Sequence, residues 1–233
     1  MRTISVCVST HERAQLLRRV LSGLAVQDRP ADEVVVVDSS RSDASERLVR
    51  SFAAERPELS IRYVRSMRRA LPWNRWLGFS STTGDIVLFL DDDVRLAPSA
   101  IAVLERAYST LAASDVGAIA GIGFLFTWDD GQPLVRDTGE LRERWLGTAR
   151  RAAGTMGPGG IPVTPAGLLS DDPLPVAHFW GGAMSYPRDV LARIGYLDRL
   201  IALYERGIGR AEDIVLSSCA RAFGDLFLIT RPL

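Results

Sequence analysis

The sequence predicts an α/β protein in which a mostly parallel sheet is covered by helices on both faces. The first observation behind this prediction is that near-continuous apolar segments of strand length alternate with amphipathic segments of helical period. The second is that polar residues follow three of the apolar segments, where sheets of this kind bind ligands. The third is the composition, because 233 residues with 47% hydrophobic and 24% charged side chains are typical of a soluble globular protein.

The first half of the chain carries the alternation. TISVCVS (3–9) is expected to be a buried strand, and residues 12–27 a helix whose apolar side chains fall on one face. EVVVVD (33–38) is expected to be the second strand, followed by another amphipathic helix. The pattern continues with strands at 60–64, 85–90 and 116–122 and with helices at 73–82 and 98–111.

After about residue 122 the alternation breaks. Residues 123–177 are rich in Gly, Pro, Asp and Arg, which predicts hairpins and long loops. Regularity returns with Pro187 at the first position of a helix, a last helix over 211–223 and a strand over 225–230. We therefore expect a single domain, 1–233, with two halves, 1–122 and 123–233.

Composition and charge exclude several classes of function. All 28 basic residues are arginine, so a lysine Schiff base, a lysine general base and a P-loop lysine are excluded. The formal net charge is zero, which gives no reason to expect nucleic acid or an acidic membrane as a partner. Cys7 and Cys219 lie far apart, and no secretory leader or apolar run of membrane-spanning length is found, so a reduced cytoplasmic chain is expected.

The stretch VLFLDDDVRL (87–96) places Asp91, Asp92 and Asp93 side by side after an apolar strand. Adjacent carboxylates at the end of a buried strand raise one another's pKa unless a cation lies among them. Mg²⁺ and Mn²⁺ prefer carboxylate oxygens and keep positions for substrate phosphates, so a metal site is one interpretation. A solvated acidic turn before the next helix is the other.

Two more groups of residues in the first half have both a structural and a functional interpretation. Thr10 and Asp38 end the first two strands, where each is expected either to cap a turn or helix or to contact a ligand. An arginine cluster then precedes the strand of the acidic triplet, either as a solvated face or as a grip for phosphate. Its members are Arg62, Arg65, Arg68, Arg69 and Arg75.

The second half offers three further candidates. His178 is expected to be structural or, less often, a metal ligand, and Gly181 and Gly182 after it permit close approach of the backbone to a ligand. Glu212 and Asp213 open the last helix, where acidic residues are ordinary dipole partners. Beside a metal site, a carboxylate on a separate segment would also suit a general base.

Together these segments resemble the inverting glycosyltransferases of family 2, which have the GT-A fold, a Rossmann-like mostly parallel sheet flanked by helices. The opening ISVCVSTHERAQLLRRVLSGLAVQDRPADEVVVVDSSRSD is similar to that family's first strand, helix and Asp-ended second strand. GDIVLFLDDDVRL resembles its DxD segment, WGGAMSYPRDVLARIGYLD its acceptor-side block and GRAEDIVLSSCARAFG its ED motif. Trp76, where the family usually has Asn, and Ser39 and Ser40 after Asp38 depart from the pattern.

The resemblance implies a role for each matching residue. The nucleotide would contact Thr10, Glu12, Asp38, Arg75, Asp91 and Asp92 in the first half. Asp93, with Asp91, would hold a divalent cation, Mn²⁺ or Mg²⁺. Asp213 would be the catalytic base, with Glu212 beside it, and the acceptor would lie at Trp180, Gly181 and Gly182.

The implied reaction is a single displacement that moves a sugar from a nucleoside diphosphate donor to an acceptor hydroxyl. Residues 1–122 would then be the nucleotide-binding half and residues 123–233 the smaller acceptor-binding half. The family also implies a glycan or lipid-carrier acceptor, bacterial cell-surface polysaccharide synthesis, and a cytoplasmic location with peripheral association at the inner face of the membrane.

Two other classes of protein remain open on the residues. A haloacid-dehalogenase-type, Mg²⁺-dependent phosphatase would use Asp91 as nucleophile and Asp93 as acid, although that motif normally opens the first strand and is accompanied by a lysine. A non-enzyme would use the aspartates only to bind Mg²⁺ or a nucleotide sugar. Receiver-like modules are about half this length and also need a lysine.

Overall fold

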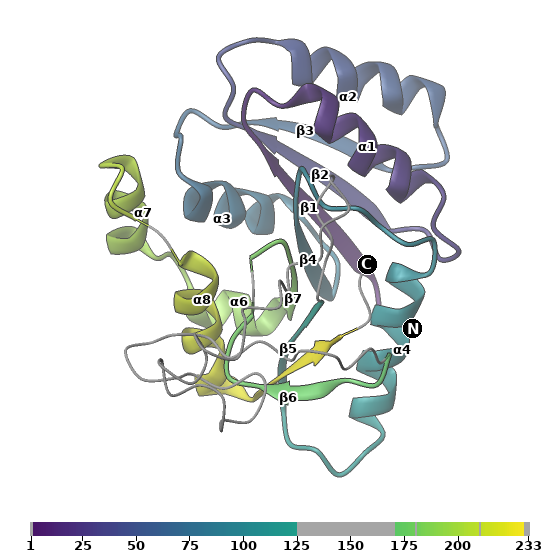
Figure 1. Cartoon of the computed structure of the whole chain (residues 1–233), viewed down its shortest axis with the longest axis vertical. Coiled ribbons are helices and arrows are strands. Elements are labelled where there is room, and N and C mark those ends of the chain that lie inside the picture. Colours follow the sequence, from purple (N-terminus) through teal and green to yellow (C-terminus); the bar gives the residue numbers. More distant parts are fainter. Residues whose placement is uncertain (1, 125–170, 180, 210, 231–233) are drawn as a thin grey trace, which may run out of the picture.

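The protein is described by a computed structural model that covers residues 2–124, 171–179, 181–209 and 211–230. One sheet of eight strands, in the order β3-β2-β1-β4-β7-β5-β8-β6, runs through these residues (Figure 1). β1 to β4 are mutually parallel, β7 is antiparallel to both β4 and β5, β8 is parallel to β5, and β6 is antiparallel to β8. The strands are β1 Ile4–Thr10, β2 Glu33–Asp38, β3 Ile61–Arg65, β4 Ile86–Asp91, β5 Ile119–Phe124, β6 Leu174–Val176, β7 Ala183–Pro187 and β8 Asp225–Ile229.

Helices cover both faces of the sheet, which confirms the predicted α/β class. Successive side chains of a strand point to opposite faces, so Val6 and Val8 of β1 pack in one core cluster and Cys7 between them packs in the other. Because both faces of the sheet are buried, the sequences of its strands are nearly continuous runs of apolar residues. The helices are α1 Ala14–Ala25, α2 Ala44–Glu55, α3 Leu71–Ser81, α4 Ala100–Ala112, α6 Arg188–Ile194, α7 Asp198–Glu205 and α8 Glu212–Ala220, with a 3₁₀ turn at Arg221–Phe223.

The close packing of α3 on the sheet positions the residues discussed below. A Cβ atom at Gly78 would lie 2.0 Å from Cys7 Sγ, so only glycine lets the helix approach β1 this closely. Leu77 and Phe79 of α3 pack against the same core cluster as α6 and α8. The first turn of α3 is therefore held over the ends of β1 and β2.

Several predicted boundaries differ from the structure for local reasons. α1 begins at Ala14 rather than at residue 12, because Glu12 has the left-handed φ of 54°. Pro187 was expected to open a helix, but it pairs with Ile86 as the last residue of β7 and is the N-cap of α6. The predicted hairpins of 123–177 lie mostly outside the described residues. Within the described residues, no helix is both long and apolar enough to cross a membrane.

Glu33, at the start of β2, forms hydrogen bonds with three neighbouring segments at the edge of the sheet where the parallel strands begin. Its carboxylate accepts hydrogen bonds from Ser5 Oγ (2.7 Å), from Thr83 N (2.5 Å) and Oγ1 (2.8 Å), and from Arg62 Nη2 (3.0 Å). Burial by itself raises the pKa of Glu33, but these hydrogen bonds outweigh it and lower the pKa to about 2. The ionised form of Glu33 therefore stabilises the fold.

This depressed pKa predicts a specific loss of stability in acid. The stabilisation is fully present above the ordinary glutamate pKa and should be lost as the pH falls toward about 2. It amounts to about 3 kcal/mol, because each unit of pKa is worth about 1.4 kcal/mol. Urea unfolding from pH 7 to pH 3 should show the difference in unfolding free energy between wild type and Glu33→Gln shrinking. The exposed Glu58→Gln is the matched control, and a difference that stays constant with pH would contradict the prediction.

Candidate active site

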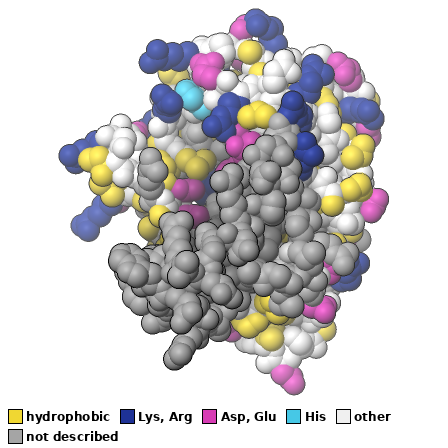
Figure 2. Space-filling model, in the orientation of Figure 1, with side chains coloured by type: hydrophobic (Ala, Val, Ile, Leu, Met, Phe, Trp, Pro, Cys, Tyr) yellow, Lys and Arg dark blue, Asp and Glu magenta, His cyan; other side chains and the backbone are white. Residues whose placement is uncertain are grey.

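A cleft of about 540 Å³ opens at the carboxyl ends of β1, β2 and β4. The registers Thr10 opposite Asp38 and Ser9 opposite Asp91 bring these three strand ends together, as the sequence predicted for one edge of a parallel sheet. The cleft is lined by residues that follow the strands and by the first turn of α3. In Figure 2, acidic side chains show near the centre of this face, with arginines around them.

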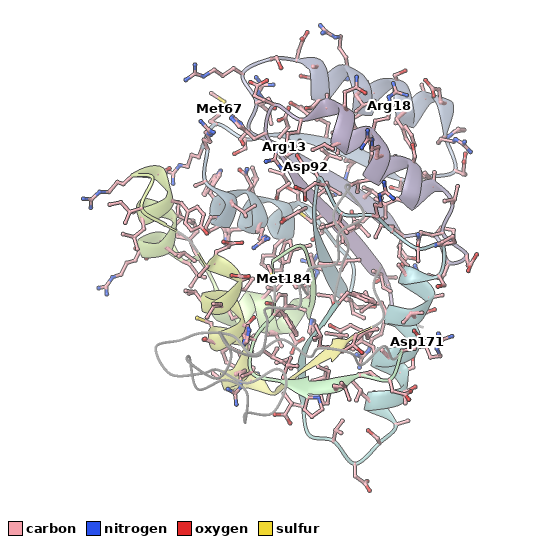
Figure 3. The ribbon with its side chains drawn as sticks, viewed as in Figure 1. Arg13, Arg18, Met67, Asp92, Asp171 and Met184 are labelled. Carbon is pink, nitrogen blue, oxygen red and sulfur yellow. The ribbon has the colours of Figure 1, made fainter. Side chains whose placement is uncertain are left out.

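The three aspartates of the acidic triplet, Asp91 to Asp93, have different surroundings. Asp92 is only 4% exposed and accepts a hydrogen bond from Thr10 Oγ1 at 2.6 Å. Arg13 Nη1 bridges Asp92 Oδ1 at 3.2 Å and Asp93 Oδ2 at 3.1 Å, and Figure 3 shows Arg13 and Asp92 together. Cationic partners of the triplet are thus supplied by the chain itself. No pattern in the sequence indicated Arg13, which was expected to lie inside a helix and instead is the N-cap of α1.

The triplet fits a divalent cation only if a ligand completes the coordination. No group of three or more His, Cys, Asp or Glu side chains within the described part of the chain is arranged to hold a metal. The side chains of Asp91 and Asp93 are about one third exposed and both line the cleft. Burial raises the pKa of Asp91 to about 6, and the charge of Asp93 adds to the rise against the effect of Arg75. Each of these two carboxylates contacts one arginine, and both also line the cleft, where their oxygens suit Mg²⁺ or Mn²⁺ that is also bound by phosphate oxygens.

Of the residues predicted to hold a nucleoside, Thr10 and Glu12 line the cleft. Thr10 is 3% exposed, and its hydroxyl is used by Asp92. The Glu12 carboxylate accepts hydrogen bonds from the backbone N–H of Arg41 at 2.6 Å and from Ser42 Oγ at 2.9 Å, so it fastens the loop after β2. Their contact with a nucleoside stays a prediction.

Asp38, which is also predicted to contact the nucleoside, does not line the cleft. It is completely buried, and its carboxylate accepts hydrogen bonds from the N–H and hydroxyl of Ser40 and from Tyr63 OH at 2.9 Å. Ser39, the next residue, lines the cleft instead. Asp38 therefore shapes the loop that carries Ser39, and a direct contact with a base or ribose would require exchange of these hydrogen bonds.

The arginine cluster divides into separate environments. Arg69 lines the cleft, whereas Arg75 is buried beside it. The other three make contacts elsewhere: Arg62 pairs with Glu33, Arg65 lies 3.9 Å from Asp38, and Arg68 pairs with Glu205 and stacks over Trp73. Each interpretation of the arginine cluster therefore applies to part of it. Arg69 and Arg75 lie at or beside the cleft, and the other three lie outside it.

Arg75 connects the acidic triplet to the start of α8. Its side chain, 5% exposed, donates from Nη1 to Glu212 Oε1 at 2.5 Å and from Nη2 to Asp91 Oδ1 at 3.2 Å and the Gly181 carbonyl oxygen at 2.8 Å. Burial would lower the pKa of Arg75, but Glu212 and Asp91 raise it above the ordinary value, so it is a fixed cation. Its guanidinium group is occupied by the protein, and the predicted nucleotide contact remains untested.

Glu212 and Asp213 are neighbours in sequence but differ in their acid–base properties. Burial raises the pKa of Glu212, but Arg75 and a hydrogen bond from Tyr204 OH outweigh it and keep the pKa low. Burial raises the pKa of Asp213, and the charge of Glu212 raises it further. Glu212 is therefore a permanent anion that holds Arg75, while Asp213 is the stronger proton acceptor of the pair.

The predicted acceptor segment lies against these two carboxylates. A Cβ atom at Gly181 would lie 3.3 Å from Glu212 Oε1 and 3.5 Å from Asp213 Oδ2, so glycine allows the close approach. The Gly182 carbonyl oxygen accepts a hydrogen bond from the backbone N–H of Asp91 at 3.0 Å. Trp180 lies outside the described residues. His178 is buried, and burial lowers its pKa, which favours the neutral imidazole.

Comparison with known proteins places the chain among sugar-transferring enzymes. The model of glycosyl transferase family 2 matches residues 5–156. The GalNAc(5)-diNAcBac-PP-undecaprenol beta-1,3-glucosyltransferase of Campylobacter jejuni is 27% identical over 104 residues, which are 45% of this chain and 34% of that protein. The aligned part is thus about a third of that relative's length.

Solved structures share the arrangement of the sheet and helices. The mannosyltransferase PcManGT of Pyrobaculum calidifontis, solved with GDP-Man and Mn²⁺, is 22% identical with a TM-score of 0.56, covering 97% of this chain and 56% of that one. GalNAc-T7, solved with UDP, GalNAc and Mn²⁺, is 17% identical with a TM-score of 0.65, covering 100% of this chain and 43% of that one. At these identities the likeness concerns the fold.

Proposed function

Because this chain belongs to glycosyl transferase family 2 and has the GT-A type of fold, we propose that it transfers a sugar from a nucleoside diphosphate donor to an acceptor hydroxyl with inversion. The observation that carries the proposal is the placement of two sets of carboxylates around Arg75. Asp91, which Arg75 contacts, and Asp93 line a cleft of nucleotide size, and Asp213 lies next to Gly181, whose carbonyl oxygen Arg75 also contacts.

Each set has one task in the proposed displacement. Asp91 and Asp93 would hold a divalent cation, which when bound offsets the negative charge of the departing diphosphate. Asp213 takes the proton of the acceptor hydroxyl while its oxygen forms a bond to the anomeric carbon. The bond from that carbon to the diphosphate oxygen breaks, and the nucleoside diphosphate leaves with the electron pair. One in-line displacement inverts the anomeric configuration.

We infer the class of acceptor from one relative of the chain. The Campylobacter jejuni relative is named for a PP-undecaprenol acceptor, which supports a lipid-linked or other glycan acceptor. We accordingly place the reaction in bacterial cell-surface glycan synthesis, at the inner face of the membrane with peripheral association. An assay of transfer to short-chain prenyl diphosphate sugars and to free glycans would separate the two kinds of acceptor.

Thermal unfolding with nucleotides tests the donor site. UDP, GDP, dTDP and CDP are each added with and without Mn²⁺ to wild type, Asp93→Ala and the surface control Asp115→Ala. One nucleotide at about a hundred times its Kd is expected to add about 2.7 kcal/mol, raising Tm by about 5–10 °C only with Mn²⁺. Asp93→Ala should lose the shift and Asp115→Ala should keep it. No shift with any nucleotide, or a full shift in Asp93→Ala, would contradict the proposed site.

Two alternatives predict different outcomes. A non-catalytic nucleotide-sugar-binding protein would show the Mn²⁺-dependent shift but no transfer or hydrolysis of the bound donor. The phosphatase interpretation loses its basis, because the glycosyltransferase family model includes the acidic triplet in residues 5–156. Release of phosphate from an aryl phosphate would restore it.

A further inference from the structure

Asn74, in the first turn of α3, is a buried amide in the wall of the cleft. Only 4% of the residue is exposed. Its Nδ2 donates to Ser39 Oγ at 3.3 Å, whereas its Oδ1 has no hydrogen-bond partner among the described residues. Buried side-chain oxygens are nearly always paired, so an unpaired one in a binding cleft indicates a group that a ligand satisfies.

The neighbouring hydrogen bonds fix which end of the amide faces the ligand. The Ser39 hydroxyl donates to the Thr10 carbonyl oxygen at 3.4 Å, so Ser39 Oγ is left to accept from Asn74 Nδ2. Oδ1 is then the free end. An amide oxygen only accepts hydrogen bonds, and phosphate oxygens at neutral pH do the same, so Oδ1 requires an N–H or O–H group and does not suit a diphosphate.

The order of the strands indicates which part of a donor lies near Asn74. The neighbours run β2-β1-β4-β7, with Ser39 after β2, the acidic triplet at the end of β4, and Gly182 before β7. Asp213 is on the β7 side, beside Gly181. A diphosphate at the triplet therefore directs the sugar toward Asp213 and the nucleoside toward Ser39 and Asn74.

We propose that Asn74 Oδ1 accepts a hydrogen bond from an N–H or O–H group of the donor's nucleoside and so helps to select the nucleotide. This assignment rests on the proposed function. The hydrogen-bond donor on the nucleoside is either an N–H group of the base or a hydroxyl group of the ribose, and either one can satisfy an amide oxygen. Arg75, the next residue, points instead toward Asp91 and Glu212, so adjacent residues of one helical turn serve the nucleoside and the catalytic side.

Isothermal titration with Mn²⁺ tests the inference on wild type and Asn74→Leu, which has a similar shape but no polar atoms. The nucleoside diphosphate that stabilises wild type most should bind the variant about tenfold more weakly. The ligand-free variant should have a Tm close to that of wild type, because it loses the hydrogen bond to Ser39 Oγ but also the unpaired buried oxygen. Nucleotide analogues that are methylated at the base N–H or that lack one ribose hydroxyl identify the group that donates to Asn74. The analogue without that group should bind wild type and variant equally.

Other outcomes separate this inference from the proposed function. Equal affinities of wild type and Asn74→Leu for the parent nucleotide would overturn the inference and leave the proposed function intact. A loss seen only with the complete nucleotide sugar would assign Asn74 to the sugar and overturn the nucleoside contact. Failure of wild type to bind any nucleotide would overturn both. Asn74→Ala, which is smaller, replaces the leucine variant if that variant does not fold, with the same expected loss.

Discussion

Asp213→Asn is expected to lower kcat by about 10³-fold while donor binding stays at the wild-type level. Asparagine keeps the size of the side chain and its place near Gly181, but it does not take a proton from the acceptor hydroxyl. Asp213 does not line the cleft that holds the acidic triplet, so the Mn²⁺-dependent shift of Tm with the nucleotide should be preserved. Single-turnover transfer at saturating donor measures the effect.

The pH dependence gives this prediction a second readout. Burial and the charge of Glu212 raise the pKa of Asp213. As the pH is lowered, kcat should therefore begin to fall at a higher pH than it would with an exposed aspartate as the base. The acid limb should disappear in Asp213→Asn. Asp198→Asn, at the first turn of α7, changes an acidic residue in a similar helix position and should leave kcat unchanged. Transfer by Asp213→Asn at the wild-type rate would end the assignment of this residue as base.

Arg75→Met is expected to cause the largest loss of stability among single arginine substitutions, about 3–5 kcal/mol. Methionine fills much of the space but leaves Glu212 and Asp91 without the cation that both contact. Removing one partner of a buried ion pair leaves an uncompensated charge, whereas an exposed pair contributes little. Arg47→Met, in the exposed pair with Asp43, is the matched control and should cost less than about 1 kcal/mol.

A double variant distinguishes this mechanism from a simple loss of packing. Arg75→Met combined with Glu212→Gln removes one of the two unpaired charges, so urea unfolding should show part of the stability regained. Additive losses in the double variant would indicate that Arg75 acts through packing alone. The loss of Arg75 should also reduce kcat, because the charge of Glu212 beside Asp213 would no longer be held in place.

The sequence by itself determined the fold class and the edge of the sheet at which the cleft lies. Continuous apolar strands alternating with amphipathic helices require a parallel sheet with both faces buried. In such a sheet the carboxyl ends of β1, β2 and β4 share one edge, so Thr10 and the acidic triplet had to meet there. Four motifs in order were then enough to indicate the family, and the family model confirmed it.

Only the tertiary structure decided which charges meet and which are buried. The cations of the triplet come from Arg13 and Arg75, and Arg75 pairs with Glu212, which is 137 residues away in sequence. Such pairs depend on side-chain reach and packing between distant segments, for which local sequence has no signal. The opposite pKa shifts of the adjacent Glu212 and Asp213 show the same dependence. Desolvation and partner charge are properties of the folded environment. The sequence therefore specifies which groups can titrate, and the packing around each group decides the direction in which its pKa shifts.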